Sequence, residues 1–83
     1  MANSSKFNMI VTQLVATVLK VEPSSVTSET SMKTTPEWDS LRHMELILAI
    51  EDRFGLILDG DEIACMTTVG SIHDVLRLKG VMQ

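Results

Sequence analysis

The stretch EWDSLRHMELILAIEDRFG, residues 37–55, carries the signals for both ends of a helix. Asp39 belongs to the residue types that cap helix N-termini, and Gly55 is the residue type that most often follows a helix C-terminus. Between them, apolar residues recur at spacings of three and four, which is the period of an amphipathic helix. The stretch therefore predicts a helix from about Ser40 to Phe54.

This helix has more apolar surface than contact with one core requires. At about 100° per residue, one stripe falls on the side expected to face the core, and it consists of Leu46, Ile47, Ile50 and Phe54. A second stripe lies on a different side, and we call it the apolar strip: Leu41, Met44 and Leu48. Carboxylates border the apolar strip, with Glu45 and Asp52 on one side and Glu51 on the other.

Two interpretations of the apolar strip are open on this pattern alone. It can pack under a loop at residues 21–38 or against a short third helix, because apolar stripes usually contact a core. Alternatively, it is a docking face, with apolar contacts at its centre and carboxylates that attract basic partners. Both can hold in part, with Leu41 and Met44 more exposed than Leu48.

The chain before this helix divides into another helix and a long connection. Residues 6–20 repeat apolar side chains with the helical period, and Ser4 or Ser5 can cap their start. Residues 21–38 are rich in Ser, Thr and Pro and lack periodicity, so they predict a loop. A loop of this length is uncommon unless it is functional or pinned to the core. The expected anchors are Val21, Val26 and Met32.

The chain after Gly55 predicts a short helix and a final helix. The short helix lies near residues 61–66, capped by Asp59 or Asp61. The final helix covers residues 69–79, begins after Thr67 or Thr68, ends at Gly80, and faces the core with Ile72, Val75 and Leu76. The fold class is therefore all-α: a small four-helix bundle of three main helices and one short helix, with a long loop between helices 1 and 2.

Length and composition fit one small globular domain. The 83 residues predict a single domain over 1–83, with a flexible N-terminus over 1–5. Hydrophobic residues make up 45% of the chain, which is typical of a folded rather than a disordered protein. Cys65 is the only cysteine, so an internal disulfide is excluded, and we expect this residue to be a small core side chain.

Charge and targeting signals exclude several classes of partner. The net charge is −4 and the seven basic residues are scattered, which argues against nucleic acid binding. Two histidines without a CxxC motif form no credible zinc site. The N-terminus lacks the order of a signal peptide and no apolar run is long enough to span a membrane, so we expect a cytoplasmic monomer.

Ser40 allows three interpretations. It can be a hydrolase nucleophile with His43 as its base, but no GxSxG motif is present and His43 projects next to the core stripe, where a satisfied histidine is expected. It can be part of an ordinary helix start. It can also be a modification site, because an added phosphate would lie at the positive end of the helix, where an anion is favoured by about 0.3–1 kcal/mol. His73, on the final helix, is expected to be solvated.

A resemblance selects among these interpretations. The run Asp39-Ser40-Leu41, the following Met44-Glu45-Leu46 and the later Ile50-Glu51-Asp52-Arg53-Phe54 resemble the core motif of acyl carrier proteins, which are phosphopantetheine-binding carrier domains. The likeness extends over nearly the whole chain and includes the segment MTTVGSIHDVL, residues 66–76, which is similar to the start of that family's last helix.

The resemblance implies a carrier rather than an enzyme. Ser40 would receive 4′-phosphopantetheine from coenzyme A through a phosphopantetheinyl transferase, with Asp39 as the acidic residue before it. The arm would hold an acyl or aminoacyl group as a thioester and present it to loading and acyl-transfer enzymes. The positions that match those read by partners in this family are Leu41, Met44, Glu45, Leu48, Glu51 and Asp52.

The sequence also departs from the commonest fatty-acid carriers. Pro36-Glu37-Trp38 replaces a small, Gly-containing approach to Ser40, and Arg42 stands where an acidic residue is frequent. These departures favour a specialised biosynthetic pathway. Trp38 is expected to pack the loop onto the helix start, with partner recognition as the other interpretation. The alternative function for the whole chain is an unmodified interaction module that docks through the apolar strip.

Overall fold

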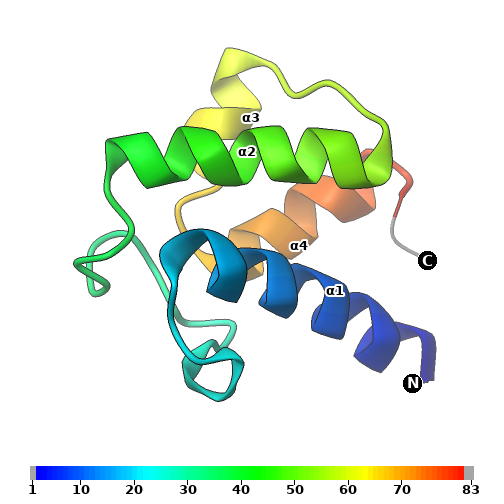
Figure 1. Cartoon of the computed structure of the whole chain (residues 1–83). Coiled ribbons are helices and arrows are strands. Elements are labelled where there is room, and N and C mark those ends of the chain that lie inside the picture. Colours follow the sequence, from blue (N-terminus) through cyan, green and yellow to red (C-terminus); the bar gives the residue numbers. More distant parts are fainter. Residues whose placement is uncertain (1, 82–83) are drawn as a thin grey trace.

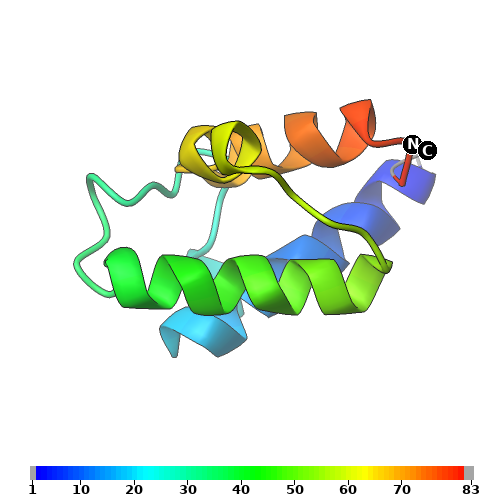
Figure 2. The same ribbon diagram turned by 90° about the horizontal axis from the view of Figure 1, so that it is seen from above.

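The computed structural model describes the backbone of residues 2–81 and the side chains of residues 9–81. Its elements are α1 (Ala2–Leu19), a 3-10 turn η1 (Pro23–Ser25), α2 (Ser40–Phe54), α3 (Gly60–Cys65) and α4 (Val69–Leu78). Figures 1 and 2 show α2 running beside α1 and α4, with the long loop at one end and the start of α1 and the end of α4 at the other. This architecture confirms the predicted all-α fold of three main helices and one short helix.

One apolar stripe from each main helix builds the core. The fully buried members are Val11, Val15 and Leu19 of α1, Leu46, Ile47 and Ile50 of α2, and Val69, Ile72 and Leu76 of α4. Phe54 is partly buried against them. Burying one such aliphatic side chain stabilises the fold by about 1.5–3 kcal/mol relative to leaving it exposed. The core-facing stripe predicted for α2 is therefore confirmed.

The start of α1 differs from the prediction. The helix begins at Ala2, so Ser4 and Ser5 lie inside it and neither is its cap. Residues 2–5, predicted as a flexible N-terminus, are helical, and Met1 lies outside the described residues. A helix can extend this far because Ala2 is a strong helix former and no Pro or Gly interrupts the first turns.

The long loop is pinned by backbone hydrogen bonds to the start of α4. The N–H groups of Val69 and Gly70 donate to the carbonyls of Thr30 and Ser28, each at 3.0 Å. Two of the N–H groups that a helix N-terminus leaves without intrahelical partners are thus satisfied by the loop. Its three predicted anchors pack partly buried against the core, as expected: Val21, Val26 and Met32.

Local capping explains where the last two helices begin. Asp59 Oδ1 accepts from the Glu62 N–H at 2.8 Å, and Glu62 Oε1 accepts from the Asp59 N–H at 3.0 Å. This reciprocal capping box starts α3 at Gly60, and Thr68 forms the equivalent box with Ser71 at the start of α4. The prediction that Cys65 is a core residue is wrong, because α3 turns no fully buried side chain inward and Cys65 is exposed.

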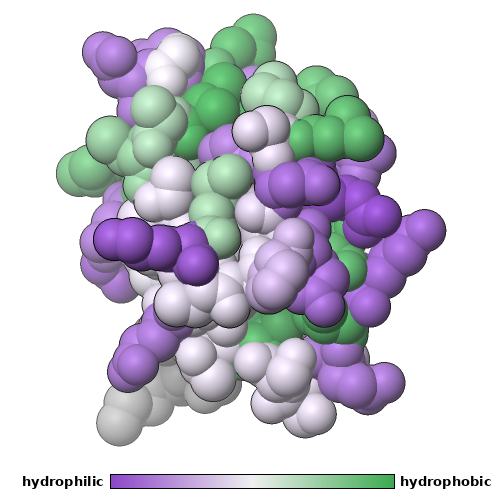
Figure 3. All heavy atoms as spheres, turned by 90° about the vertical axis from the view of Figure 1, so that its left-hand side faces the viewer, coloured by the Kyte–Doolittle hydropathy of each residue, from purple (hydrophilic) through white to green (hydrophobic). Residues whose placement is uncertain are grey.

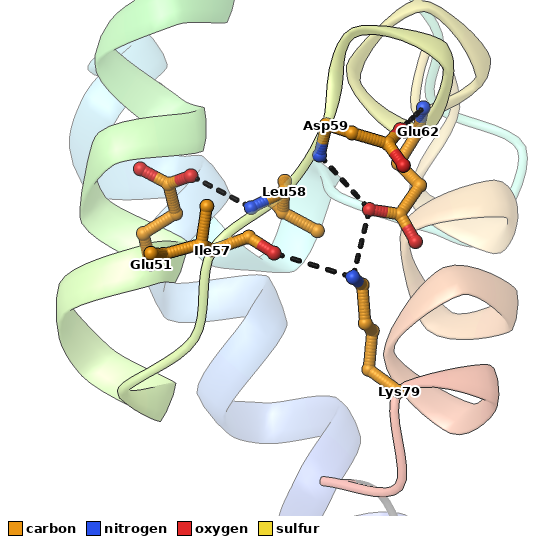
Figure 4. Close-up of polar contacts among 6 residues, drawn as sticks. All are labelled: Glu51, Ile57, Leu58, Asp59, Glu62 and Lys79. Atoms are coloured by element: carbon orange, nitrogen blue, oxygen red, sulfur yellow. Dashed lines mark hydrogen bonds and ion pairs between the residues drawn. The ribbon is translucent and has the colours of Figure 1, made fainter.

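Polar contacts hold the connection between α2 and α3, as Figure 4 shows. Glu51 Oε2 accepts from the Leu58 N–H at 2.9 Å, which ties α2 to the connection. Lys79 Nζ donates to the Ile57 carbonyl at 3.2 Å and lies 2.9 Å from Glu62 Oε1. One lysine beyond the end of α4 therefore joins the connection and α3 to the C-terminal end of the bundle.

His73 is half-buried on α4, so the prediction that it is solvated is wrong. Burial lowers the pKa of His73 below its ordinary value of 6.5, the Arg77 guanidinium lowers it further, and Asp74 opposes both. The physical reason is that a half-buried ring loses part of the hydration that stabilises its charged form.

We predict different effects on stability for alanine at two glycines that both have open space around them. No atom lies within 4 Å of the place that a methyl group would take at Gly55 or Gly60, but Gly55 alone of the two has a left-handed backbone, with φ of 65°. Gly55→Ala should lower the free energy of unfolding by about 1 kcal/mol. Gly60→Ala should leave it unchanged or raise it by about 0.4–1 kcal/mol. Urea denaturation measures both; equal effects would show that backbone conformation is not the cause.

We also predict that His73 makes stability depend on pH. Because its folded pKa lies below 6.5, the unfolded chain binds more protons between the two values, so stability falls as the pH drops through 6.5 toward the folded pKa. His73→Gln should flatten this part of the curve of unfolding free energy against pH. A curve unchanged by the substitution would contradict the assignment.

Candidate functional site

The N-terminus of α2 is fixed by Asp39. Its Oδ1 accepts a hydrogen bond from the Arg42 N–H at 2.9 Å, and its carbonyl accepts the first intrahelical bond from the His43 N–H at 2.8 Å. These two bonds are the pattern of a side-chain N-cap. The helix therefore begins at Ser40 and ends before Gly55, which has a left-handed conformation, as the sequence predicts.

Ser40 occupies the first helical position and its side chain is exposed. The first turn of α2 contains no acidic residue, and the only adjacent carboxylate, Asp39, is engaged as the cap. A phosphodiester on Ser40 would meet the positive end of a 15-residue helix, where an anion is stabilised by about 0.3–1 kcal/mol. An accessible hydroxyl at this helix end fits a covalent phosphopantetheine arm.

His43 cannot serve Ser40 as a general base in this arrangement. Its ring is buried, Nδ1 accepts a hydrogen bond from the indole Nε1–H of Trp38 at 3.0 Å, and Nε2 lies 2.9 Å from the Ile63 carbonyl. Since Nδ1 is an acceptor, the proton of the neutral ring is on Nε2, which donates to Ile63. Both nitrogens are committed to structural bonds, and neither has a lone pair available to the serine hydroxyl.

Trp38 packs the end of the loop onto the start of α2. Its side chain is only 1% exposed, and its ring centroid lies 6.0 Å from that of His43. The prediction that Trp38 contributes packing is confirmed, and a role as an exposed recognition residue is excluded by its burial.

The apolar strip is exposed and does not contribute to the core. The exposed fractions are 68% for Leu41, 47% for Met44 and 61% for Leu48, so the interpretation as a packed stripe is wrong. Leu48 is also more exposed than Met44, contrary to expectation. Figure 3, which faces the end of the molecule where α2 begins, shows apolar side chains gathered in the upper part of that face, with hydrophilic ones around and below them.

The acidic neighbours of the apolar strip differ in what they contact. Glu45 and Asp52 are exposed, and Glu45 Oε1 lies 3.7 Å from Arg42 Nε. Glu51 is half-buried and its carboxylate is engaged by the Leu58 N–H. Glu45 and Asp52 are therefore available to a partner, whereas Glu51 contributes to the α2–α3 connection.

Arg42 has a structural role that sequence reasoning missed. Its Nη1 donates to the Val18 carbonyl at 2.8 Å, which lies in the last turn of α1. A cation at a helix C-terminus satisfies a carbonyl without an intrahelical partner and opposes the negative end of the helix dipole. The start of α2 is thereby tied to the end of α1, and no local signal in the sequence indicates this bond, because its two residues are 24 positions apart.

Within the described residues, the structure does not support a pocket that includes Ser40, a metal site or a membrane-spanning helix. A hollow of about 250 Å³ lies between α1 and α2, with Ile10, Leu14, Val18, Ala49 and Arg53 among its lining residues, and Ser40 is not one of them. Within the described part of the chain, no group of His, Cys, Asp and Glu could hold a metal ion. No helix in residues 2–81 has the length and apolar character needed to cross a membrane.

Comparisons with known proteins agree with the geometry. Residues 10–76 match the family described as "Phosphopantetheine attachment site". The acyl carrier protein of Thermosynechococcus vestitus is 34% identical over 77 residues, which cover 93% of this chain and 95% of that protein. The meromycolate extension acyl carrier proteins of Mycobacterium leprae and Mycobacterium tuberculosis are each 29% identical over 62 residues, or 75% of this chain, and the match spans 54% of their length. The chain therefore belongs to the acyl carrier protein family, whose members are not enzymes but carry covalently attached 4′-phosphopantetheine and present acyl groups to other enzymes.

Proposed function

We propose that Ser40 is the attachment residue and that the chain carries an acyl or aminoacyl thioester in a specialised biosynthetic pathway. The observation that carries the attachment site is the exposed hydroxyl at the first position of α2, directly after the capping Asp39. Among residues 9–81, whose side chains the structure describes, Ser71 also lies in the first turn of a main helix, but it is half-buried and its hydroxyl donates to the Thr68 carbonyl at 2.8 Å. Ser40 is the better acceptor for the arm because its hydroxyl oxygen is accessible to an incoming transferase.

Attachment of the phosphopantetheine arm requires little chemistry from this chain. Ser40 Oγ forms the new bond to phosphorus of coenzyme A, the bond from that phosphorus to the adenosine bisphosphate breaks, and the transferase supplies a base for the hydroxyl proton. Once attached, the arm supplies a terminal thiol on which an acyl group is held as a thioester. The chain contributes the exposed oxygen, the cap that fixes its helix and the positive helix end beside the phosphodiester.

The apolar strip is the docking face that this function requires. Its three side chains start one residue after Ser40 and continue for two turns of α2, so a partner that receives the arm can contact them at the same time. Exposed Glu45 and Asp52 favour partners with a basic surface around an apolar centre. Such partners include the phosphopantetheinyl transferase and the enzymes that load and transfer the acyl group.

Support for a specialised pathway comes from residues around the site. Arg42 and His43 make the start of α2 less acidic, and the structure gives both of them internal bonds. The name of the mycobacterial relatives, meromycolate extension acyl carrier protein, refers to a dedicated pathway in those organisms. We further propose that the chain acts as a cytoplasmic monomer. The alternative function, an unmodified module that docks through the same strip, is favoured only by the exposure of the strip.

Loading with coenzyme A separates these functions. Incubation with coenzyme A and a broad-specificity phosphopantetheinyl transferase should add one phosphopantetheine unit to the intact chain, read by mass spectrometry. Ser40→Ala should remain unmodified, and Ser71→Ala should load like the wild type. An unmodified wild type would favour the docking module, and a loaded Ser40→Ala variant would place the arm elsewhere.

A matched pair of variants tests the docking face. Leu48→Gln and Leu78→Gln both remove an exposed leucine, with exposed fractions of 61% and 87%, from α2 and from the end of α4. Both should change the free energy of unfolding by less than about 0.5 kcal/mol. Only Leu48→Gln should raise the KM of the transferase for the carrier, by about tenfold, because it removes a central interface contact. Equal KM values for the two variants would contradict the assignment.

A further inference from the structure

The carrier role described above uses neither Trp38 nor His43, although both are buried within three residues of the exposed Ser40. His43 is the buried polar side chain that stands out among residues 9–81, with an exposed fraction of 8%. A buried polar ring is costly unless it is hydrogen-bonded, because it gives up its bonds to water. Its partners therefore show what holds it there.

The first partner belongs to the turn that carries Ser40. With Asp39 as the cap, Trp38 precedes the cap by one residue and His43 is the fourth helical residue. Apolar residues at these two positions often pack together and fix the angle at which the chain enters a helix. Here the pair also shares the 3.0 Å hydrogen bond from Nε1 of Trp38 to Nδ1 of His43. Ser40 lies between the two residues in sequence, so their hydrogen bond holds the turn that carries Ser40 on both sides.

The second partner of His43 belongs to α3. Its Nε2–H donates to the Ile63 carbonyl at 2.9 Å. Because α3 has six residues and none is fully buried, hydrophobic contact alone holds it weakly. The two bonds form a chain from Trp38 through His43 to Ile63, which we call the relay. It joins the loop, the first turn of α2 and α3.

We propose that Trp38 and His43 are positioning residues for Ser40, which act by locking the first turn of α2 to α3. This inference rests on the proposed function of Ser40. A partner enzyme then meets the serine and the neighbouring surface of α3 in one preset arrangement. Without the relay, the turn and α3 sample other arrangements, and the apparent affinity of the partner enzyme falls in proportion to the fraction of molecules that remain competent to bind.

Three variants separate positioning from general stability. Trp38→Phe keeps an aromatic ring but deletes the indole N–H, and His43→Leu removes both bonds while keeping an apolar side chain of similar size. The control is Ile72→Val on α4, which shortens a fully buried core residue whose apolar side chain forms neither of the two hydrogen bonds of the relay.

Amide hydrogen exchange reports the coupling directly. In Trp38→Phe, protection of the amides at Ile63, Met66 and Arg42 should fall by about fivefold more than that of the α1 and α4 amides, since one neutral hydrogen bond is lost. In His43→Leu the difference should be larger. In Ile72→Val, all amides should change together.

Loading kinetics test the consequence for Ser40. The KM of the phosphopantetheinyl transferase should rise for Trp38→Phe and rise further for His43→Leu, with kcat unchanged and with wild-type values for Ile72→Val. Uniform loss of protection, or KM values equal to those of the control, would overturn the inference while leaving Ser40 as the attachment site. If the wild type itself is not loaded, the proposed function fails; selective loss of protection in α3 would then still support the locking step, and uniform loss would overturn that as well.

Discussion

A buried hydrogen bond between the side chains of Trp38 and His43 holds the end of the long loop to the start of α2, and a second bond from His43 adds α3. The indole has one polar group, its Nε1–H, and the imidazole has two ring nitrogens, so the two side chains can be buried only if these groups find partners. The indole satisfies one ring nitrogen, and the Ile63 carbonyl satisfies the other. Leaving any one of these groups unsatisfied would cost about 1–3 kcal/mol, a large fraction of the stability of a small domain.

The helix α2 has two roles, packing in the core and presenting a surface, and they lie on different sides of the helix. One side of the helix supplies the core with Leu46, Ile47 and Ile50, and a different side presents the apolar strip to solvent. Exposed leucines on α2 are tolerated because the buried side of the helix, the Asp39 cap and the Arg42 bond to α1 already fix its position. Presentation of a surface thus does not compete with folding of the core, and partners can read the strip without unfolding any part of it.

Much of this was predictable because the signals are local. The ends of α2 follow from Asp39 and Gly55, and the starts of α3 and α4 from Asp59 and Thr68, since a cap is recognised from residues within one turn. The exposure of Ser40 follows from its place after a cap. The sequence could not decide whether the apolar strip was covered, because that depends on where the loop and α3 lie.

Apart from the start of α1, the misses depend on contacts between residues far apart in the chain. The burial of His73 and the exposure of Cys65 depend on how α4 and α3 turn against the core, which a helical projection does not determine. The bond from Arg42 to Val18 spans 24 residues, and that from His43 to Ile63 spans 20. Only the pairing of Trp38 with His43, five residues apart, was within reach of a capping rule, as a variant of the apolar pair around a helix start.

The most direct measurement is the tautomer of His43 by nitrogen NMR on the isotope-labelled protein, with the coupling across its hydrogen bond to Trp38. The account predicts a neutral ring protonated on Nε2, with a coupling between Nδ1 and the indole nitrogen. A ring protonated on Nδ1, or an indole N–H that exchanges as fast as one exposed to water, would contradict the account.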